Sequence, residues 1–324
     1  MQTKEIAQRV LAGDRRGVAR AISMVEDASP DLPSLSEAIY PHTGRAHTVG
    51  VTGSPGVGKS SLAAQLVRTA RERGQTVAVL AIDPTSPFTG GALLGDRLRM
   101  QAHATDPGVF IRSMATRGHL GGMALAAPEA LRVLDASGKD LILVETVGVG
   151  QAEVEVATAT DTTLVVVSPG WGDAIQVSKA GILEIADVFV VNKADKEGAD
   201  DAVRDLRNML RMGPKPSWSP PIIKTSTLSE EGINDLWDAI QQHREHQMSS
   251  GELDRKRNRR VVDEVESMVA FRLREQAETS LASDEGGGLV NELTARTLDP
   301  YRAAAILLDR VSGGSGIVVR EGDD

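Results

Sequence analysis

The feature of this chain that most restricts its fold is a glycine-rich loop between a short apolar run and a helix-forming segment. The loop reads Gly53-Ser54-Pro55-Gly56-Val57-Gly58-Lys59-Ser60 and follows the apolar residues 48–52. Strand, loop and helix in that order are the context in which such a loop binds phosphate. Its glycines can adopt backbone angles closed to other residues, so consecutive N–H groups can turn toward an anion. The sequence therefore predicts a nucleoside triphosphate site; the simpler alternative is a turn that binds nothing.

Two side chains and one helix end give this loop its expected chemistry. The helix that should begin near Lys59 directs the positive end of its dipole at the anion. Lys59 is the catalytic candidate that reaches the β- and γ-phosphates, and the Ser60 hydroxyl is placed to ligate Mg²⁺. The loop residues expected to contact the nucleotide are Gly53, Ser54, Pro55, Gly56, Val57, Gly58, Lys59, Ser60 and Ser61.

Apolar and helix-forming segments alternate from residue 46 onward. The strand segments are short, rich in β-branched residues and nearly all apolar, as expected of parallel strands covered on both faces. We therefore predict an α/β domain with a doubly wound, mostly parallel sheet and its ligand at the carboxyl ends of the strands. Strands are expected at 48–52, 76–82, 140–144, 163–167, 188–191 and 221–225, and helices at 59–73, 123–137, 174–186, 199–211 and 230–243.

The first 45 residues are expected to form an N-terminal helical extension. Residues 3–26 have helical periodicity that breaks at Gly13, with Asp14 available to cap a second helix. Pro30, Pro33 and Pro41 then indicate a linker toward the main domain.

The strand pattern stops near residue 245. Residues 254–280 are highly charged, but Val261, Val265, Met268 and Val269 share one face of the expected helix. Glycines 286–288 are expected to form a loop before another helix at 299–309. A region this polar buries little by itself, so it should pack on the main domain or on a second subunit. The expected parts are thus 1–45, a nucleotide-binding domain at 46–245 and a C-terminal helical region at 246–324.

Composition excludes several classes of function. The 324-residue chain has a net charge of −9 and a sequence pI near 5.3, which argues against nucleic acid or an anionic membrane as a partner. The basic run 255–260 lies beside acidic residues and is interpreted as a solvated helix face. Because the chain has no cysteine, disulfides, thiolate catalysis and cysteine-ligated zinc are excluded. With no secretion signal and no long apolar span, the expectation is a cytoplasmic protein.

A second motif, Asn192-Lys193-Ala194-Asp195, follows the expected strand 188–191. The Asp195 carboxylate can accept hydrogen bonds from guanine N1–H and the 2-amino group, whereas adenine has neither donor. A buried Asp195 would then be unpaired opposite adenine, which pockets of this kind reject by roughly 10⁴ or more. Asn192 would hold the loop, and the Lys193 stem would lie along the base. Ser226-Thr227-Leu228 would form a second wall of the base pocket. The motif at 192–195 therefore predicts that the nucleotide is GTP. The alternative is that these four residues form a plain loop that binds no base.

Acidic side chains at strand ends are the candidates for the metal site. Glu145 follows the apolar residues 141–144, and Asp83 follows 77–82. Carboxylates at those positions face Mg²⁺ directly or through water. Asp96 is a third candidate, for which an ordinary surface salt bridge is an equal alternative.

Gly148 and Gln151, which both follow Glu145 in the sequence, are candidates for sensing the γ-phosphate or for promoting its cleavage. The Gly148 backbone N–H can approach the γ-phosphate and register its loss. Gln151 lies close enough in sequence to position an attacking water, by analogy with other GTPases. Since no arginine-finger position is obvious, we expect slow hydrolysis of the nucleotide that a partner protein accelerates.

The longer motifs resemble the MeaB/ArgK family, which includes the human methylmalonic aciduria type A protein. The resemblance covers roughly residues 3–311. Its motifs are the phosphate loop, Asp83-Pro84-Thr85-Ser86-Pro87-Phe88-Thr89-Gly90-Gly91, Gly95-Asp96-Arg97-Leu98-Arg99-Met100, the segment from Arg112 to Gly122, Glu145-Thr146-Val147-Gly148-Val149-Gly150-Gln151 and Asn192-Lys193-Ala194-Asp195.

The resemblance implies a SIMIBI-class GTPase that is a homodimeric metallochaperone for an adenosylcobalamin-dependent acyl-CoA mutase, usually methylmalonyl-CoA mutase. GTP hydrolysis in that family gates cofactor delivery and protects the mutase, so adenosylcobalamin would be met only through the partner. The resemblance also implies that Asp83, Asp96 and Glu145 surround Mg²⁺ and that the flanking helices serve dimerisation. Residues 172–179 would face the mutase, and Trp171 would be either a contact or a core residue.

Two other functions remain as alternatives. A metal-insertion GTPase shares the fold class, but it normally needs cysteine or clustered histidine, and the six histidines here are scattered. A kinase or ATPase linked to amino-acid transport, an older label of the same family, would need an acceptor pocket that the sequence does not reveal.

Overall fold

The structure is a computed structural model of the chain. It describes residues 2–84, 103, 105–116, 122–146, 156–170, 184–212 and 217–311. The chain forms two compact units, residues 1–261 and residues 262–324.

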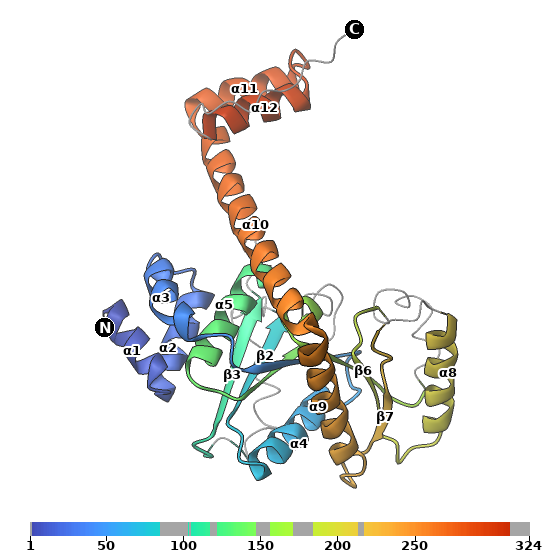
Figure 1. The fold of residues 1–324 in the computed structure, drawn as a ribbon. Coiled ribbons are helices and arrows are strands. Elements are labelled where there is room, and N and C mark those ends of the chain that lie inside the picture. The colour runs from blue at the N-terminus through green and yellow to red at the C-terminus, as the bar shows by residue number, and fades with distance from the viewer. Residues whose placement is uncertain are drawn as a thin grey trace. The chain divides into compact units, whose positions relative to one another are not determined.

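Within the described residues, seven parallel strands form one sheet in the order β3-β2-β4-β1-β5-β6-β7 (Figure 1). The strands are β1 (His47–Thr52), β2 (Val77–Pro84), β3 (Val109–Thr116), β4 (Leu141–Thr146), β5 (Thr162–Val167), β6 (Val188–Asn192) and β7 (Ile222–Thr225). The chain builds outward from β1 to β3, returns through β4 and then builds in the other direction. This is the doubly wound sheet that the sequence predicts, and β1 lies at its switch point.

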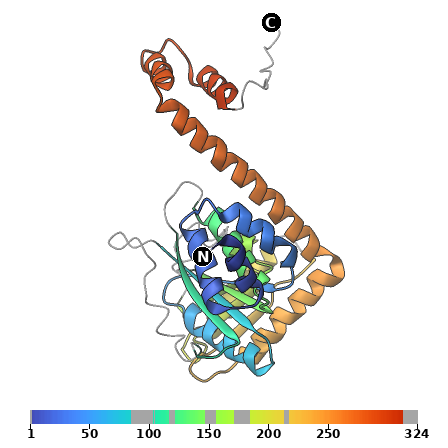
Figure 2. The same ribbon diagram turned by 90° about the vertical axis from the view of Figure 1, so that its left-hand side faces the viewer.

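Helices cover both faces of the sheet (Figures 1 and 2). One face packs its valines and leucines against α4 (Lys59–Glu72) and α9 (Ile233–Ser250). The helices on the opposite face are α1 (Thr3–Leu11), α2 (Arg15–Glu26), α3 (Leu32–Ile39), α5 (Gly122–Ala136) and α8 (Ala199–Met212). Alternate residues of each strand enter the two cores, which explains why the strands are apolar on both faces. The expected helix at 174–186 lies largely outside the described residues.

The edge strand β3 is absent from the sequence-based prediction. Its sequence is interrupted by Arg112 and Ser113, so it does not have the continuous apolar run of the central strands. The structure compensates the charge, because Arg112 Nη2 pairs with Glu26 of α2 at 2.5 Å. The charge that interrupts this strand is therefore paired with a carboxylate from a helix distant in sequence.

The N-terminal region is more regular than the prolines suggest. Asp14 caps α2 as predicted, accepting a hydrogen bond from the Gly17 N–H at 2.7 Å. The expected linker, however, contains α3, with Pro33 in its first turn and a 3₁₀ turn (Tyr40–His42) after it. Proline is tolerated in the first turn because those N–H groups have no intrahelical partner. Leu35 and Ile39 are fully buried, so packing stabilises this short helix.

The C-terminal helices are α10 (Glu252–Leu281), α11 (Asp284–Thr294) and α12 (Pro300–Val311). The prediction of a loop at glycines 286–288 is wrong, since all three lie in the first turns of α11. Ser283 caps this helix by accepting a hydrogen bond from the Gly286 N–H at 3.3 Å. A capping serine offsets part of the low helix propensity of glycine.

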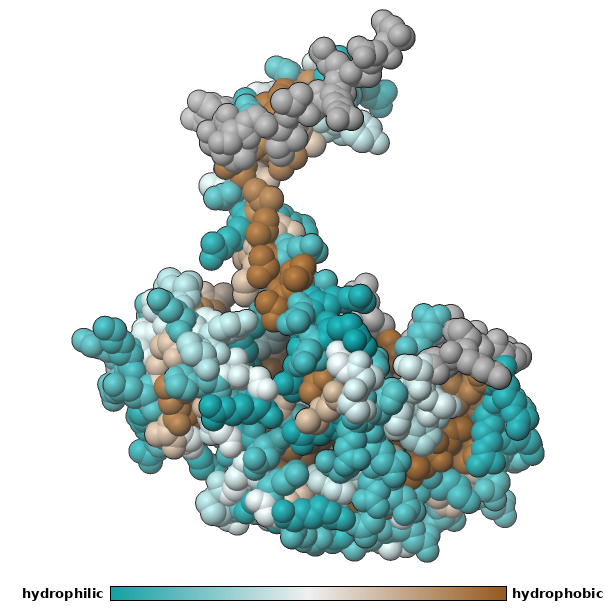
Figure 3. Space-filling view, viewed as in Figure 1, coloured by the Kyte–Doolittle hydropathy of each residue, from teal (hydrophilic) through white to brown (hydrophobic). Residues whose placement is uncertain are grey.

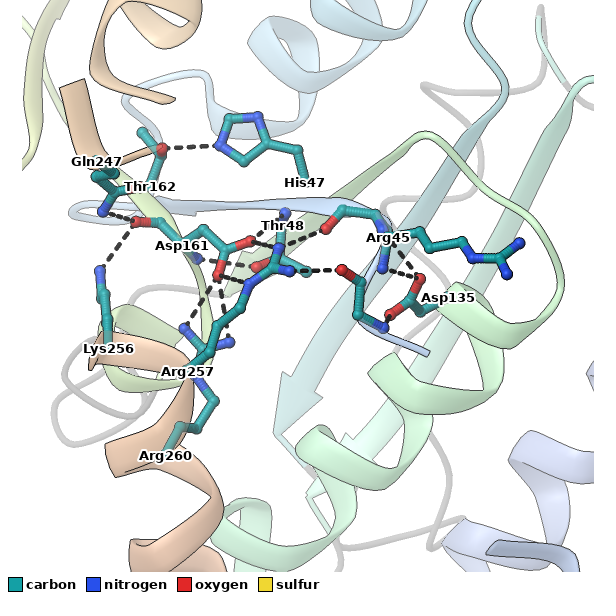
Figure 4. A network of polar contacts seen from close by, with 12 residues as sticks. Arg45, His47, Thr48, Asp135, Asp161, Thr162, Gln247, Lys256, Arg257 and Arg260 are labelled. Atoms are coloured by element: carbon teal, nitrogen blue, oxygen red, sulfur yellow. Dashed lines mark hydrogen bonds and ion pairs between the residues drawn. The ribbon is translucent and has the colours of Figure 1, made fainter. Parts of the chain in front are cut away.

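A buried carboxylate, Asp161, joins the start of α10 to the amino-terminal end of the sheet (Figure 4). Its side chain is fully buried and accepts hydrogen bonds from Arg257 at 2.7 Å and from the Thr48 N–H at 3.1 Å, with Arg260 at 3.4 Å. Burial raises the pKa of Asp161, but the hydrogen bonds and charge of Arg257 outweigh it and hold the pKa well below its ordinary value. The expectation that 255–260 is only a solvated face is therefore wrong.

Beside this network, a hydroxyl links two histidines. Thr162 Oγ1 lies 2.9 Å from His47 Nε2 and 2.9 Å from His243 Nδ1. Burial lowers the pKa of His47 from 6.5 to about 3 and also lowers the pKa of His243, even though Asp187 lies 3.3 Å from His243 Nε2. Both rings are therefore neutral in the folded protein near neutral pH.

Candidate functional site

The glycine-rich loop lies at the centre of the sheet, where β1 ends and α4 begins. β4 and β5 flank β1, so their carboxyl ends also meet at this loop. In open α/β sheets ligands bind at such a switch point. α4 begins at Lys59, so the first N–H groups of the helix face the same space as the loop.

Two glycines of the loop make approaches that a side chain would block. Gly53 has φ of 134°, and a Cβ added there would lie 2.1 Å from the Val166 carbonyl oxygen of β5. Gly58 has φ of 100°, and its added Cβ would lie 2.4 Å from Asn192 Nδ2. The loop therefore needs glycine both for its backbone angles and for its contact with neighbouring strands.

The Lys59 ammonium folds back over the loop. Its Nζ donates hydrogen bonds to the carbonyl oxygens of Gly53 at 2.7 Å and Ser54 at 3.1 Å. The residue is only 6% exposed, so Lys59 is part of the loop's packing and not a surface charge. Holding the cation against two loop carbonyls places positive charge in the phosphate-binding loop.

Ser60 and Glu145 form the oxygen-rich part of the site. The Ser60 hydroxyl donates to Glu145 Oε1 at 2.5 Å, and both residues are buried. A hydroxyl and a carboxylate in contact are the hard oxygen donors that Mg²⁺ takes, so these residues fit that metal. Asp83 lies at the carboxyl end of β2, but its side chain is outside the described residues, as are Asp96, Gly148 and Gln151.

The second motif lies directly against the phosphate loop. Asn192 Nδ2 donates to the Val57 carbonyl at 2.8 Å, and Lys193 Nζ donates to the Gly56 carbonyl at 2.6 Å. Asn192 is fully buried and therefore holds the loop, as the sequence predicts. Lys193 therefore also contacts the phosphate loop, and the packing of its stem along a base stays a prediction.

The sequence-based account missed Thr225, which orients the motif. Its Oγ1 donates to Asn192 Oδ1 at 3.2 Å, and its carbonyl accepts a hydrogen bond from the Ala194 N–H at 2.9 Å. Thr225 ends the last strand and is fully buried. A polar residue at the carboxyl end of a strand was the signal available in the sequence.

Asp195 and the 226–228 loop form the other end of the site. The Ser226 hydroxyl donates to Asp195 Oδ1 at 2.7 Å, and this hydrogen bond lowers the Asp195 pKa. The Asp195 side chain is exposed rather than buried, and Leu228 is 86% exposed. Gln65 of α4 reaches the Thr227 carbonyl at 3.4 Å, so α4 contacts this loop as well as the phosphate loop.

The fold and this arrangement of loops define a P-loop nucleotide-binding protein of the SIMIBI type. The family profile described as "Methylmalonyl Co-A mutase-associated GTPase MeaB" matches residues 18–282. The chain belongs to this family of GTPases.

Relatives support the assignment along most of the chain. A Pyrococcus abyssi protein with the name "Putative GTPase" is 48% identical over 98% of this chain and 99% of its own. GTPase ArgK of Escherichia coli is 36% identical over 80% of this chain and 81% of its own. The mitochondrial methylmalonic aciduria type A homolog of Mus musculus is 32% identical over 92% of this chain and 77% of its own.

A solved structure confirms the fold. The crystal structure of an LAO/AO transport system kinase superposes with a TM-score of 0.71, at 26% identity, over 96% of this chain and 97% of that one. The residues that the structure describes hold no cluster of three or more His, Asp or Glu residues arranged for a metal, and none of the helices among them has the length and apolarity of a membrane span.

Proposed function

We propose that the protein binds GTP with Mg²⁺, hydrolyses it, and acts as a chaperone that gates adenosylcobalamin loading into an acyl-CoA mutase and protects that enzyme. The observation that carries the nucleotide part is the contact between the two motifs. Asn192 of the base-reading loop is bonded to Val57 of the phosphate loop at 2.8 Å. One ligand can therefore reach both loops, with phosphate at one end and guanine at the other.

For hydrolysis, the chain would contribute mainly position and charge. Loop N–H groups, the α4 terminus and Lys59 would stabilise charge on the transferring γ-phosphoryl group while water attacks in line. Ser60 and Glu145, with Asp83 and Asp96 as further candidates, would hold Mg²⁺, which would supply positive charge opposite the phosphates. Gln151 is proposed to position the water, and Gly148 to sense the γ-phosphate.

The proposed partner rests on family membership and on what relatives are named for. The family description names a methylmalonyl-CoA mutase, and the mouse relative is named for methylmalonic aciduria. Methylmalonyl-CoA mutase is therefore the first client to test. Turnover is proposed to be slow until the mutase binds.

We also propose that the protein is a homodimer built through its C-terminal helices. Along α10, Val265 is 54% exposed, Met268 37% and Val269 51%. Figure 3 shows an apolar run along this helix. Exposed apolar residues at helical spacing are typical of a helix that packs against another chain.

A co-precipitation with purified methylmalonyl-CoA mutase tests the chaperone function. Retention of mutase that differs between GDP and a non-hydrolysable GTP analogue, together with faster GTP hydrolysis when mutase is added, is the expected result. Equal retention and an unchanged rate would contradict the chaperone role while leaving nucleotide binding intact. Transfer of phosphate to an amino-acid-binding protein instead of water would favour the kinase alternative.

A further inference from the structure

The loop 226–231, between β7 and α9, is closed by its own hydrogen bonds. The Ser226 N–H donates to the Glu231 carbonyl at 3.0 Å, and the Ser229 N–H donates to the Ser226 hydroxyl at 3.3 Å. Gly232 follows the loop with φ of 71°, and a Cβ added there would lie 1.9 Å from the Lys224 carbonyl oxygen. The loop is therefore folded tightly against the end of β7.

One residue of this loop has a backbone conformation that side chains rarely adopt. Glu230 has φ of 62°, in the left-handed region, which costs free energy for a residue other than glycine. A residue stays in this region only where the surrounding contacts hold it there, and such residues gather at functional sites. The side chain of Glu230 makes its contacts with α4, the helix that begins in the phosphate loop.

The contact between α4 and the loop is an ion pair with two hydrogen bonds. Arg68 Nη1 lies 2.6 Å from Glu230 Oε1, and Arg68 Nη2 lies 2.5 Å from Glu230 Oε2. The hydrogen bond from Arg68 lowers the pKa of Glu230, so the pair is charged near neutral pH. Paired hydrogen bonds of this kind fix orientation as well as distance. Gln65 of the same helix also donates to the Thr227 carbonyl at 3.4 Å, so two residues of α4 hold the loop.

The same loop carries the hydroxyl that contacts Asp195. Ser226 Oγ donates to Asp195 Oδ1 at 2.7 Å, and a carboxylate oxygen can accept more than one hydrogen bond. The Asp195 carboxylate can therefore keep this bond while it accepts hydrogen bonds from a base. Because the Asp195 side chain is exposed, its direction depends on where the loop places Ser226.

We propose that Arg68 is a positioning residue for guanine recognition. Its ion pair with Glu230 fixes the loop 226–231. Ser226 is then held where its hydroxyl orients the Asp195 carboxylate toward the base. This role rests on the proposed binding of GTP, and it assigns part of the selectivity for guanine to a residue that acts through the loop.

Inosine triphosphate (ITP) is the probe for this role, because it lacks the 2-amino group of guanine and keeps every other part of GTP. By titration calorimetry, the wild-type protein should bind GTP at least about tenfold more tightly than ITP, since ITP loses a hydrogen bond to a charged acceptor. In Glu230→Gln the ratio of the two affinities should fall about threefold, as expected when a well-formed exposed ion pair is lost. Arg68→Gln should have the same effect.

Glu72→Gln is the matched control. Glu72 is a second carboxylate beside Arg68, at 3.7 Å, but it belongs to α4 itself, so its loss should leave the affinity ratio unchanged. The double variant Arg68→Gln with Glu230→Gln should resemble either single variant, because the effects of two residues that act as one pair do not add. A general loss of stability would weaken the binding of both nucleotides equally and would not change the ratio.

Hydrogen exchange gives a readout that needs no nucleotide. Without the ion pair the loop 226–231 should open more often. The Ser226 and Ser229 amides should therefore exchange faster in Glu230→Gln than in the wild type or in Glu72→Gln.

Four results would overturn the role of Arg68 while the wild-type preference for GTP stays intact. They are an unchanged affinity ratio in Glu230→Gln, an equal change in Glu72→Gln, additive losses in the double variant, and unchanged exchange of the loop amides. A wild-type protein that binds GTP and ITP equally, or binds neither, would instead contradict the proposed function, and the role of Arg68 would fall with it.

Discussion

Asn192 donates a hydrogen bond from its side-chain amide to the carbonyl of Val57, with 2.8 Å between nitrogen and oxygen. This single bond connects the loop expected to read the base with the loop expected to hold the phosphates. Thr225 orients the amide from the other side at 3.2 Å. The two ends of the proposed nucleotide site are therefore connected by a hydrogen bond, and a substitution in one loop should alter nucleotide binding at the other.

Asp195→Asn tests which base the site reads. The amide cannot accept both guanine hydrogen bonds, but it can donate to the 2-carbonyl of xanthine. We expect GTP affinity to fall roughly 100-fold, since hydrogen bonds to a charged acceptor are lost, while xanthosine triphosphate binds better than to wild type. Titration calorimetry with both nucleotides measures this, and an unchanged preference for GTP would place the base elsewhere.

Gly58→Ala tests the contact between the two loops. A methyl group there would meet Asn192 Nδ2 at 2.4 Å and would require φ of 100°. The matched control is Gly74→Ala, where φ is 78° but no atom lies within 4 Å of the added carbon. Both changes should cost about 1–3 kcal/mol of stability through backbone strain. Only Gly58→Ala should also weaken nucleotide binding, and equal binding by the two variants would show that the contact does not matter.

Asp161→Asn tests the anchor of α10. The change leaves Arg257 and Arg260 without their buried counter-charge. We expect the free energy of unfolding to fall by about 3–5 kcal/mol. Asp201→Asn removes an exposed partner of Arg204 and should cost less than about 1 kcal/mol. Urea denaturation of both variants measures the difference, and similar values would mean that the buried network adds no stability.

Acid should destabilise the protein through His47 and His243. Both have pKa values lowered by burial, His47 from 6.5 to about 3. At a pH between the folded and unfolded pKa values of these histidines, the unfolded chain binds more protons than the folded one. Their contribution to the free energy of unfolding is therefore fully present above about pH 6.5 and falls as the pH drops below it. Melting temperatures between pH 7.5 and 5.5 should show this decline. The decline should be smaller in His47→Gln; an identical pH slope in that variant would contradict the assignment to His47.

The central sheet could be predicted from sequence because each of its inner strands is a short apolar run. The phosphate loop and the motif at 192–195 could also be identified from the sequence, since each follows an apolar strand and the order of strand, glycine loop and helix is typical of a phosphate site. The sequence could not show which residues distant in the chain form ion pairs with each other. In β3, Arg112 is paired with Glu26 of α2, and in the run 255–260 Arg257 is paired with the buried Asp161. Neither partner is visible from local pattern.

Local chemistry also misled in two places. Glycines 286–288 suggested a loop, but a serine cap places them in a helix. The prolines near residue 33 suggested a linker, although packing of Leu35 and Ile39 stabilises a short helix there. In both cases tertiary burial or capping outweighed intrinsic propensity.

Titration calorimetry of the pure protein with GTP and with ATP, in the presence of Mg²⁺, tests the account most directly. GTP should bind in one site, ATP should bind more weakly because adenine has neither donor for the Asp195 carboxylate, and Lys59→Met should lose GTP binding while remaining folded. Equal affinity for ATP and GTP, or no binding of either, would contradict the account.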